Sequence, residues 1–135
     1  MEYISYDEFK KMDIRVGTIR SVEPIEGADK LLKFMIDFGL DDTEVLSGKE
    51  TETITTEGEE PIEKPKLRQI LSGIREFYPE YEQLVGKQAL YIINLEPRII
   101  RGLESQGMLM AVDGKNGAPV FLVPEREVNT GSKVR

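Results

Sequence analysis

The sequence lacks cysteine, histidine and tryptophan altogether. Without cysteine the chain forms no disulfide bond and offers no thiolate nucleophile, and without cysteine and histidine it cannot build the common zinc sites. The missing histidine also removes the side chain that most often acts as a general base near neutral pH. Carboxylates and lysines remain, but they form no paired-carboxylate or lysine motif. We therefore expect a non-enzymatic protein with no catalytic residues, no metal site and no cofactor.

Long apolar runs are missing as well. No stretch approaches the roughly 18 apolar residues of a membrane helix, and the N-terminus has no charged-then-apolar leader. We expect a cytoplasmic protein with no membrane association. With 135 residues, the chain is expected to form a single domain over residues 1–135, with one hydrophobic core.

Basic residues are too few to balance the acidic ones, and the net charge is −7. This balance at first argues against binding a polyanion. Residues 41–66, however, hold nine acidic and three basic residues, a net charge of −6, which leaves −1 for the rest. This acidic segment has few large apolar side chains, and we interpret it as an insertion between the second and third strands. The near-neutral remainder can still carry a basic face.

The N-terminal residues predict a short helix. Ser5 and Glu8 form a capping-box pattern, so the helix is expected to begin after Ser5 and to end at about Lys11. Tyr6 and Phe9, three residues apart, would then be available to pack on the body of the protein.

The remaining apolar pattern is that of short strands. In residues 13–23 the alternation slips near Gly17, which predicts a bulge or bend there. Residues 24–29 form a turn-rich loop, and residues 32–38 alternate cleanly between apolar and polar or flexible side chains. Further strands are expected at residues 69–74, 89–95, 108–112 and 120–123, with a helical turn at residues 80–84 after the third strand and a small hairpin at residues 45–49.

Five or so strands with one helical turn after the third match an all-β fold, the five-stranded Greek-key barrel known as the OB-fold. The pattern alone leaves a different barrel or a sandwich open. Leu-Ser-Gly occurs twice, at residues 46–48 and 71–73. We assign the second copy to the third strand.

The most informative segment is residues 94–110. It follows an apolar run that predicts a buried strand, turns at Pro97, offers Arg98 and Arg101, and returns through Ser-Gln-Gly-Met at residues 105–108. None of these side chains is an obvious acid, base or nucleophile. The segment is therefore expected to hold a ligand.

This segment resembles the tRNA-binding domain of bacterial and archaeal methionyl-tRNA synthetases, which is also found in small stand-alone proteins. Residues 13–17, 29–33, 72–78 and 124–135 resemble other parts of the same family in the right order. The resemblance covers the chain except for the acidic insertion. It implies the OB-fold and a module that recognises folded tRNA by shape, as a separate beta subunit of the synthetase or as a stand-alone factor.

The resemblance also implies a set of RNA-binding residues: Asn94, Arg98, Arg101, Ser105, Gln106, Met108, Lys30 and Lys33. From the residues alone, other roles stay open. Asn94 can cap a turn, Met108 can belong to the core, and the charged side chains can simply be solvated. The expected partners are tRNA and a second copy of the chain, and a methionyl-tRNA synthetase catalytic chain is a further candidate.

Two alternative functions come from other classes. A secretion-associated chaperone shares the fold and the opening segment, residues 13–17, but lacks Ser-Gln-Gly-Met. A scaffold of a multi-synthetase complex would use the acidic insertion as a docking arm. A cytokine-like relative carries a further C-terminal domain, and the end of the sequence at Arg135 argues against that type.

Overall fold

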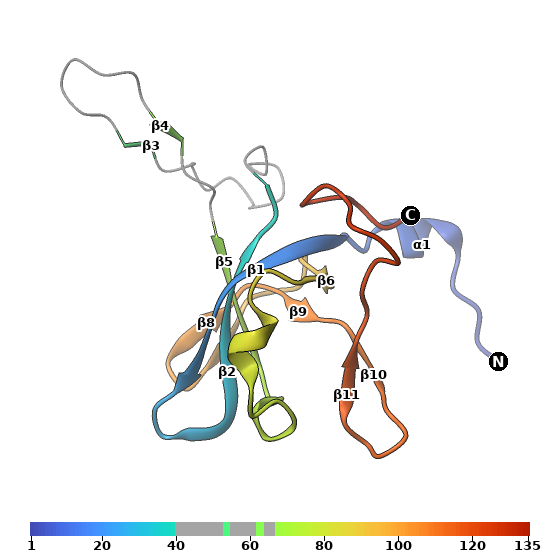
Figure 1. Cartoon of the computed structure of the whole chain (residues 1–135). Helices are drawn as coiled ribbons and strands as arrows, with labels where there is room; N and C mark the ends of the chain where they lie inside the picture. Colours follow the sequence, from blue (N-terminus) through green and yellow to red (C-terminus); the bar gives the residue numbers. More distant parts are fainter. Residues whose placement is uncertain (40–52, 55–61, 64–66) are drawn as a thin grey trace.

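The computed structural model describes residues 1–39, 53–54, 62–63 and 67–135 (Figure 1). Its main feature is a five-stranded antiparallel sheet with the order β5-β2-β1-β6-β9. The strands of this sheet are β1 (Ile14–Ile25), β2 (Ala28–Asp37), β5 (Leu67–Ser72), β6 (Gln88–Ile92) and β9 (Met108–Leu109). The fold is mainly β and of the OB-barrel type, which confirms the predicted fold class.

Three small two-stranded sheets accompany the main sheet. They pair β3 (Thr53–Ile54) with β4 (Ile62–Glu63), β7 (Arg98–Ile100) with β8 (Leu103–Ser105), and β10 (Ala111–Asp113) with β11 (Pro119–Phe121). In Figure 1 the β10–β11 hairpin extends away from the barrel. The hairpin predicted at residues 45–49 lies outside the described residues.

Helical structure follows the third strand of the main sheet, as predicted. Two short 3-10 turns, η1 (Arg75–Phe77) and η2 (Tyr81–Leu84), come after β5. β5 contains Leu71 and Ser72 and pairs with β2, so the second Leu-Ser-Gly copy is confirmed as the third strand. Within the described part of the chain, no helix is long and apolar enough to cross a membrane.

The N-terminal helix α1 (Tyr6–Lys10) carries the predicted capping box, in which Ser5 and Glu8 each bond the other's backbone N–H. The expectation that Tyr6 packs on the body is wrong, because its side chain is 72% exposed. Its ring instead lies 6.4 Å from that of Phe9 and beneath the ammonium group of Lys10. The helix thus has no buried residue.

The core follows from the alternation in β2. Leu32, Phe34 and Ile36 are fully buried and pack with residues of β1, β5 and β6. The Tyr91 ring meets that of Phe38 edge-on at 5.6 Å between ring centres. Among the described residues the Tyr91 hydroxyl has no hydrogen-bond partner, and burial raises the pKa of Tyr91.

The bend predicted at Gly17 lies elsewhere. Gly17 pairs regularly with Ala89, and the two irregularities in the β1–β2 ladder fall between Ile19 and Ser21 and between Pro24 and Ile25. Gly17 is required for a different reason: a Cβ placed there would overlap Cγ2 of Ile36 and come within 2.8 Å of the Phe38 ring. The glycine makes room for core side chains of the neighbouring strand.

Two other boundaries differ from prediction. The loop expected at residues 24–29 is a tight turn, because β1 continues to Ile25 and β2 begins at Ala28. The strand expected at residues 108–112 is divided between β9, which pairs with β6, and β10, which pairs with β11. Met110 lies at the change of partner and bonds the backbones of Leu90 and Leu122.

Candidate functional site

The hairpin β7–β8 carries both predicted arginines. Arg98 begins β7, and Arg101 forms the two-residue turn with Gly102. Both turn residues have a positive φ, 53° for Arg101 and 79° for Gly102, as in the type I′ turns that suit tight hairpins. An arginine is unusual at the first position of such a turn, where asparagine and aspartate are preferred, so a cation is held at the hairpin tip at some conformational cost.

Both arginines are exposed, and neither side chain forms a hydrogen bond or an ion pair with any other described residue. The arginines closer to the core behave differently. Arg15 pairs with Asp13 at 2.8 Å, and Arg20 pairs with Asp37 at 2.8 Å. The hairpin therefore presents two guanidinium groups whose donors are available to an anionic ligand.

A cavity of about 440 Å³ lies beside the hairpin. It brings together three of the predicted residues, Arg98, Ser105 and Met108. The Met108 side chain is 51% exposed, so it contributes to the surface of this cavity and not to the core. The described residues that line it are Leu71, Leu95, Glu96, Arg98, Ile100, Ser105, Gly107 and Met108. We call this space the Met108 cavity.

A second, smaller cavity of about 240 Å³ joins Arg101 to Lys30 and the β1–β2 turn. Lys30 is exposed, and its ammonium group lies 3.8 Å from a carboxylate oxygen of Glu76. Lys33 lines neither of these two cavities. Its ammonium group lies 3.2 Å from the carboxylate of Glu23 on the paired strand, and its side chain is largely covered. Lys30 thus joins the arginines, whereas the charge of Lys33 is balanced within the protein.

Ser105 and Gln106 hold the barrel closed. The Ser105 hydroxyl, which is buried, accepts the Leu71 N–H at 3.0 Å and donates to the Gly107 carbonyl at 3.2 Å. The Gln106 N–H donates to the Gln69 carbonyl at 2.8 Å, and its side-chain oxygen accepts the Gln69 N–H at 3.2 Å. These bonds join β5 to the segment that carries Gly107 and Met108. We call this junction the closing seam.

Asn94 also has internal partners. Its side-chain oxygen accepts the Asp13 N–H at 2.9 Å, and its side-chain nitrogen donates to the Lys11 carbonyl at 2.5 Å. The amide therefore fastens the entry of β1 to the end of β6. Asn94 thus bonds backbone groups, but on the segment before β1 and not in the turn at Pro97 that the sequence suggested.

Two residues at the seam were missed by the sequence analysis. Arg68 is buried, and its Nη1 donates to the Ile93 carbonyl at 2.6 Å and to the Gln106 carbonyl at 3.1 Å. The side-chain nitrogen of Gln69 donates to the Glu104 carbonyl at 2.9 Å. Arg68 lies two residues before the apolar Ile70 and is in phase with it, which is a signal for an inward-facing side chain. Nothing local indicates the role of Gln69.

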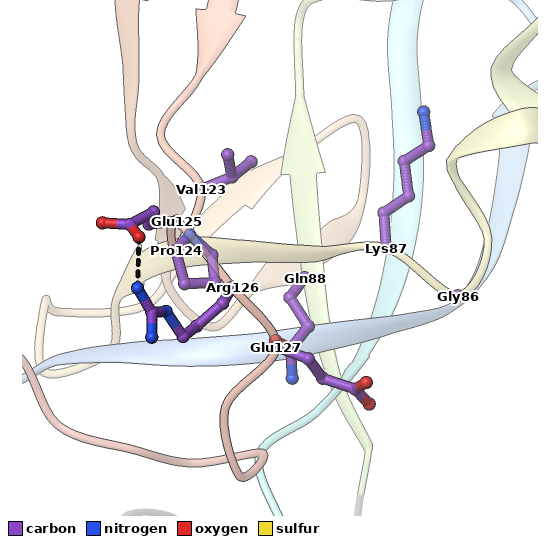
Figure 2. A pocket seen from close by; sticks show the side chains of 8 residues that line it. All are labelled: Gly86, Lys87, Gln88, Val123, Pro124, Glu125, Arg126 and Glu127. Carbon is purple, nitrogen blue, oxygen red and sulfur yellow. Dashed lines mark hydrogen bonds and ion pairs between the residues drawn. The ribbon is translucent and has the colours of Figure 1, made fainter.

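A further cavity, of about 470 Å³, lies by the closing segment of the chain and contains none of the predicted site residues (Figure 2). Figure 2 shows Glu125 and Arg126 paired with each other and Lys87 directed away from them. The Gln88 side chain is engaged with the backbone of Val128 through two hydrogen bonds. Three of the polar side chains that line this cavity are thus engaged with other described residues, so the Met108 cavity and the hairpin remain the better candidate site.

Comparisons with known proteins bear on the family of the chain. The family model described as "Putative tRNA binding domain" matches residues 58–133, which include the hairpin and the closing seam. The methionine–tRNA ligase of Bacteroides fragilis is 37% identical over 132 residues, covering 98% of this chain and 16% of that protein. This chain thus spans only a small part of the curated relatives that it matches.

Solved structures of other proteins are also similar to this chain. The MetRS related protein from Pyrococcus horikoshii is 30% identical, with a TM-score of 0.75 and 100% of both chains covered. The chaperone CsaA from Bacillus anthracis is 22% identical, with a TM-score of 0.71, and the alignment covers 99% of this chain and 100% of that one. At this identity the second likeness shows the fold alone.

Proposed function

Since the chain belongs to the family of tRNA-binding domains, we propose that it binds folded tRNA through the β7–β8 hairpin and the cavities on either side of it. We call this surface, which contains Lys30, Arg98, Arg101 and Met108, the RNA face. The observation that carries the proposal is the presence of two exposed arginines without partners among the described residues. Guanidinium groups of this kind suit phosphate oxygens and exposed bases.

The predicted site residues divide into two groups under this proposal. Arg98, Arg101 and Lys30 contact phosphates, and Met108 offers an apolar contact. Asn94, Ser105 and Gln106 have internal hydrogen bonds, so they act by holding the backbone of the face in place. Lys33, which is paired with Glu23, contributes less than Lys30.

We further propose that the chain supports aminoacylation in the cytoplasm, as a separate beta subunit of a methionyl-tRNA synthetase or as a stand-alone tRNA-binding factor. The methionine–tRNA ligase of Bacteroides fragilis, of which this chain matches 16%, supports the link to that enzyme class. The MetRS related protein, covered over its whole solved chain, supports a separate factor. Under either arrangement the chain itself is non-catalytic, and catalysis belongs to another chain.

Self-association completes the proposal. Exposed apolar side chains occur on the N-terminal segment, for example Tyr3 and Tyr6, and on and near the β10–β11 hairpin, for example Val120 and Val123. In Figure 1 both regions lie on the opposite side of the view from β8. A homodimer that covers them would leave the RNA face open and double it. Light scattering should give twice the chain mass, and a monomer at tens of micromolar would contradict the dimer.

The test of tRNA binding is the pair of substitutions Arg98→Ala and Arg101→Ala. The double variant should bind tRNA more weakly, and the slope of log affinity against log salt should fall by about 1 for each lost phosphate contact. A matched control is Lys87→Ala with Lys115→Ala, which removes two exposed cations far from the hairpin in sequence. If the two double variants weaken binding equally, binding depends only on the overall charge of the protein, and the RNA face is refuted.

A further inference from the structure

We propose that the Met108 cavity receives one unstacked guanine base of the bound tRNA, with Glu96 and Arg98 recognising its edges. This inference rests on the proposed function, since it names the part of the RNA that enters the site. It adds a base-recognising residue, Glu96, to a face that otherwise contacts the RNA backbone.

The lining of the cavity suits a planar aromatic ring. Leu71, Leu95, Ile100 and Met108 supply apolar surface, and the seam residues Ser105 and Gly107 complete the lining. Leu95 and Met108 are about half exposed, so their apolar surface faces the solvent without a partner. A phosphate group would gain little binding free energy from contact with such surface. A base would bury its own apolar faces there, away from water. The thioether of Met108 also contacts aromatic rings favourably.

Gly107 lets the segment that carries Met108 pack closely on the core. Its φ is 154°, and a Cβ there would lie 3.0 Å from the Ile92 carbonyl oxygen and 3.2 Å from Cδ1 of Ile70. A side chain at this position is therefore disfavoured by the backbone and by its neighbours. Glycine thus helps to fix the backbone next to Met108 on one side of the cavity.

Glu96 is the unexpected residue in this cavity. A carboxylate in the same cavity as Arg98 repels phosphate, so it opposes the general attraction of the face for RNA. Glu96 forms no ion pair or hydrogen bond with another described residue, although it lines the same cavity as Arg98. Opposite charges that share a cavity without pairing leave both groups available to a ligand that has donors and acceptors.

Guanine matches these two groups. Its N1–H and N2 amino group form an adjacent donor pair that a carboxylate can accept, and O6 with N7 forms an acceptor pair for a guanidinium. Adenine, cytosine and uracil lack the adjacent donor pair. An unpaired base in a folded RNA exposes these edges, and such bases are the ones that proteins recognise specifically.

The first test asks whether removal of the negative charge of Glu96 tightens or weakens tRNA binding. Replacing Glu96 by glutamine removes a negative charge from a polyanion-binding face, and that change alone should tighten tRNA binding. If Glu96 recognises guanine, Glu96→Gln should instead weaken tRNA binding by about 5-fold or more, the usual discrimination of a bidentate base contact. The control is Glu82→Gln, an exposed carboxylate on η2 without a partner among the described residues, which should not weaken binding. Tighter binding by Glu96→Gln would overturn the inference.

The second test uses mononucleotides with the full-length chain. Titration with GMP should shift the NMR signal of the Met108 methyl group. IMP, which lacks the N2 amino group, should need a concentration at least about 5-fold higher to give the same shift. Glu96→Gln should abolish this difference. Equal responses to GMP, AMP, CMP and UMP would show an unselective apolar cavity and overturn the inference. The same conclusion would follow if an apolar peptide bound there and no nucleotide did.

Competition separates the two sources of guanine. GMP should displace tRNA better than AMP does at equal ionic strength. If GMP occupies the cavity without displacing tRNA, the site belongs to a free nucleotide and the assignment to RNA falls. If tRNA binds in an Arg98-dependent way while Glu96→Gln and GMP have no effect, the guanine site falls and the proposed function stands. If tRNA does not bind at all, the proposed function itself fails.

Discussion

Ser105→Ala distinguishes a residue that positions the RNA face from one that touches RNA. The substitution deletes the hydroxyl that accepts the Leu71 N–H at 3.0 Å and donates to the Gly107 carbonyl at 3.2 Å. Leu71 and Ser105 are both buried, so water cannot easily replace the lost partner. A buried N–H left without an acceptor costs about 1–3 kcal/mol.

We therefore expect Ser105→Ala to lower the free energy of unfolding by about 1–3 kcal/mol. For a chain of this length, that loss corresponds to a decrease in Tm of about 4 °C per kcal/mol. Urea titration followed by circular dichroism measures the change, and the m-value should stay constant. At temperatures well below the Tm, tRNA affinity should fall by less than about 3-fold. That limit corresponds to a loss of about 0.6 kcal/mol of binding free energy, which we assign to a small displacement of Gly107 and Met108.

Ser21→Ala is the matched control. Ser21 lies in β1, is half-buried, and its hydroxyl has no hydrogen-bond partner among the described residues, so its loss should change stability by no more than about 0.5 kcal/mol. The reasoning is refuted if Ser105→Ala is as stable as Ser21→Ala yet binds tRNA at least about 5-fold (1 kcal/mol) more weakly. Ser105 would then be a direct RNA contact.

Three further predictions concern the core and the insertion. Tyr91→Phe removes a buried hydroxyl without a partner among the described residues, and it should raise the free energy of unfolding by about 1 kcal/mol. Because burial raises the pKa of Tyr91, the unfolded chain loses this proton before the folded chain does above pH 10. The free energy of unfolding of the wild type should therefore fall by up to about 1.4 kcal/mol per pH unit there, and that of the variant should fall less, as alkaline denaturation will measure. Gly17→Ala should lower the free energy of unfolding by about 1–3 kcal/mol through overlap with Ile36 and Phe38. Gly73→Ala, where a Cβ would lie 3.9 Å from the Lys30 carbonyl oxygen, should be nearly neutral in thermal melts. The last change deletes residues 43–65, which hold most of the −6 charge of the insertion, and joins the ends with Gly-Ser. The deletion should tighten tRNA binding at low salt, and the gain in affinity should shrink as the salt concentration rises. Unchanged affinity at low salt would exclude competition between the insertion and phosphate and would leave spacer or docking roles.

Local patterns were sufficient for much of the fold. The capping box at Ser5 and the alternation from Leu32 to Phe38 depend on neighbours within a few residues, and the structure confirms both. The slip of the pattern at Gly17 was visible, but its cause was not. Gly17 is a glycine because Ile36 and Phe38 need its volume, and that contact joins residues about 20 positions apart.

The sequence pattern predicted the candidate site as one segment, but the internal organisation of that segment was not predictable. No local pattern indicates that residues 98–105 form a separate hairpin with Arg101 in its turn, since Arg-Gly is not a strong turn signal. The bonds of Gln69 and Arg68 to Gln106 span 37 and 38 residues. Such ties depend on how the barrel closes, so no local rule assigns Ser105 and Gln106 to the closing seam.

The closing seam also predicts where the native protein first opens. β1, β2 and β5 are joined by long ladders, whereas the seam between β5 and residues 105–107 depends on a few bonds, several of them from side chains. Local opening there would break few contacts, so the Leu71 amide should exchange its hydrogen with solvent faster than the amides inside the β1–β2 ladder. A ligand that bridges Arg98 and Met108 would have to keep the seam shut, and it would therefore slow hydrogen exchange at Leu71, whose N–H makes no contact with the ligand.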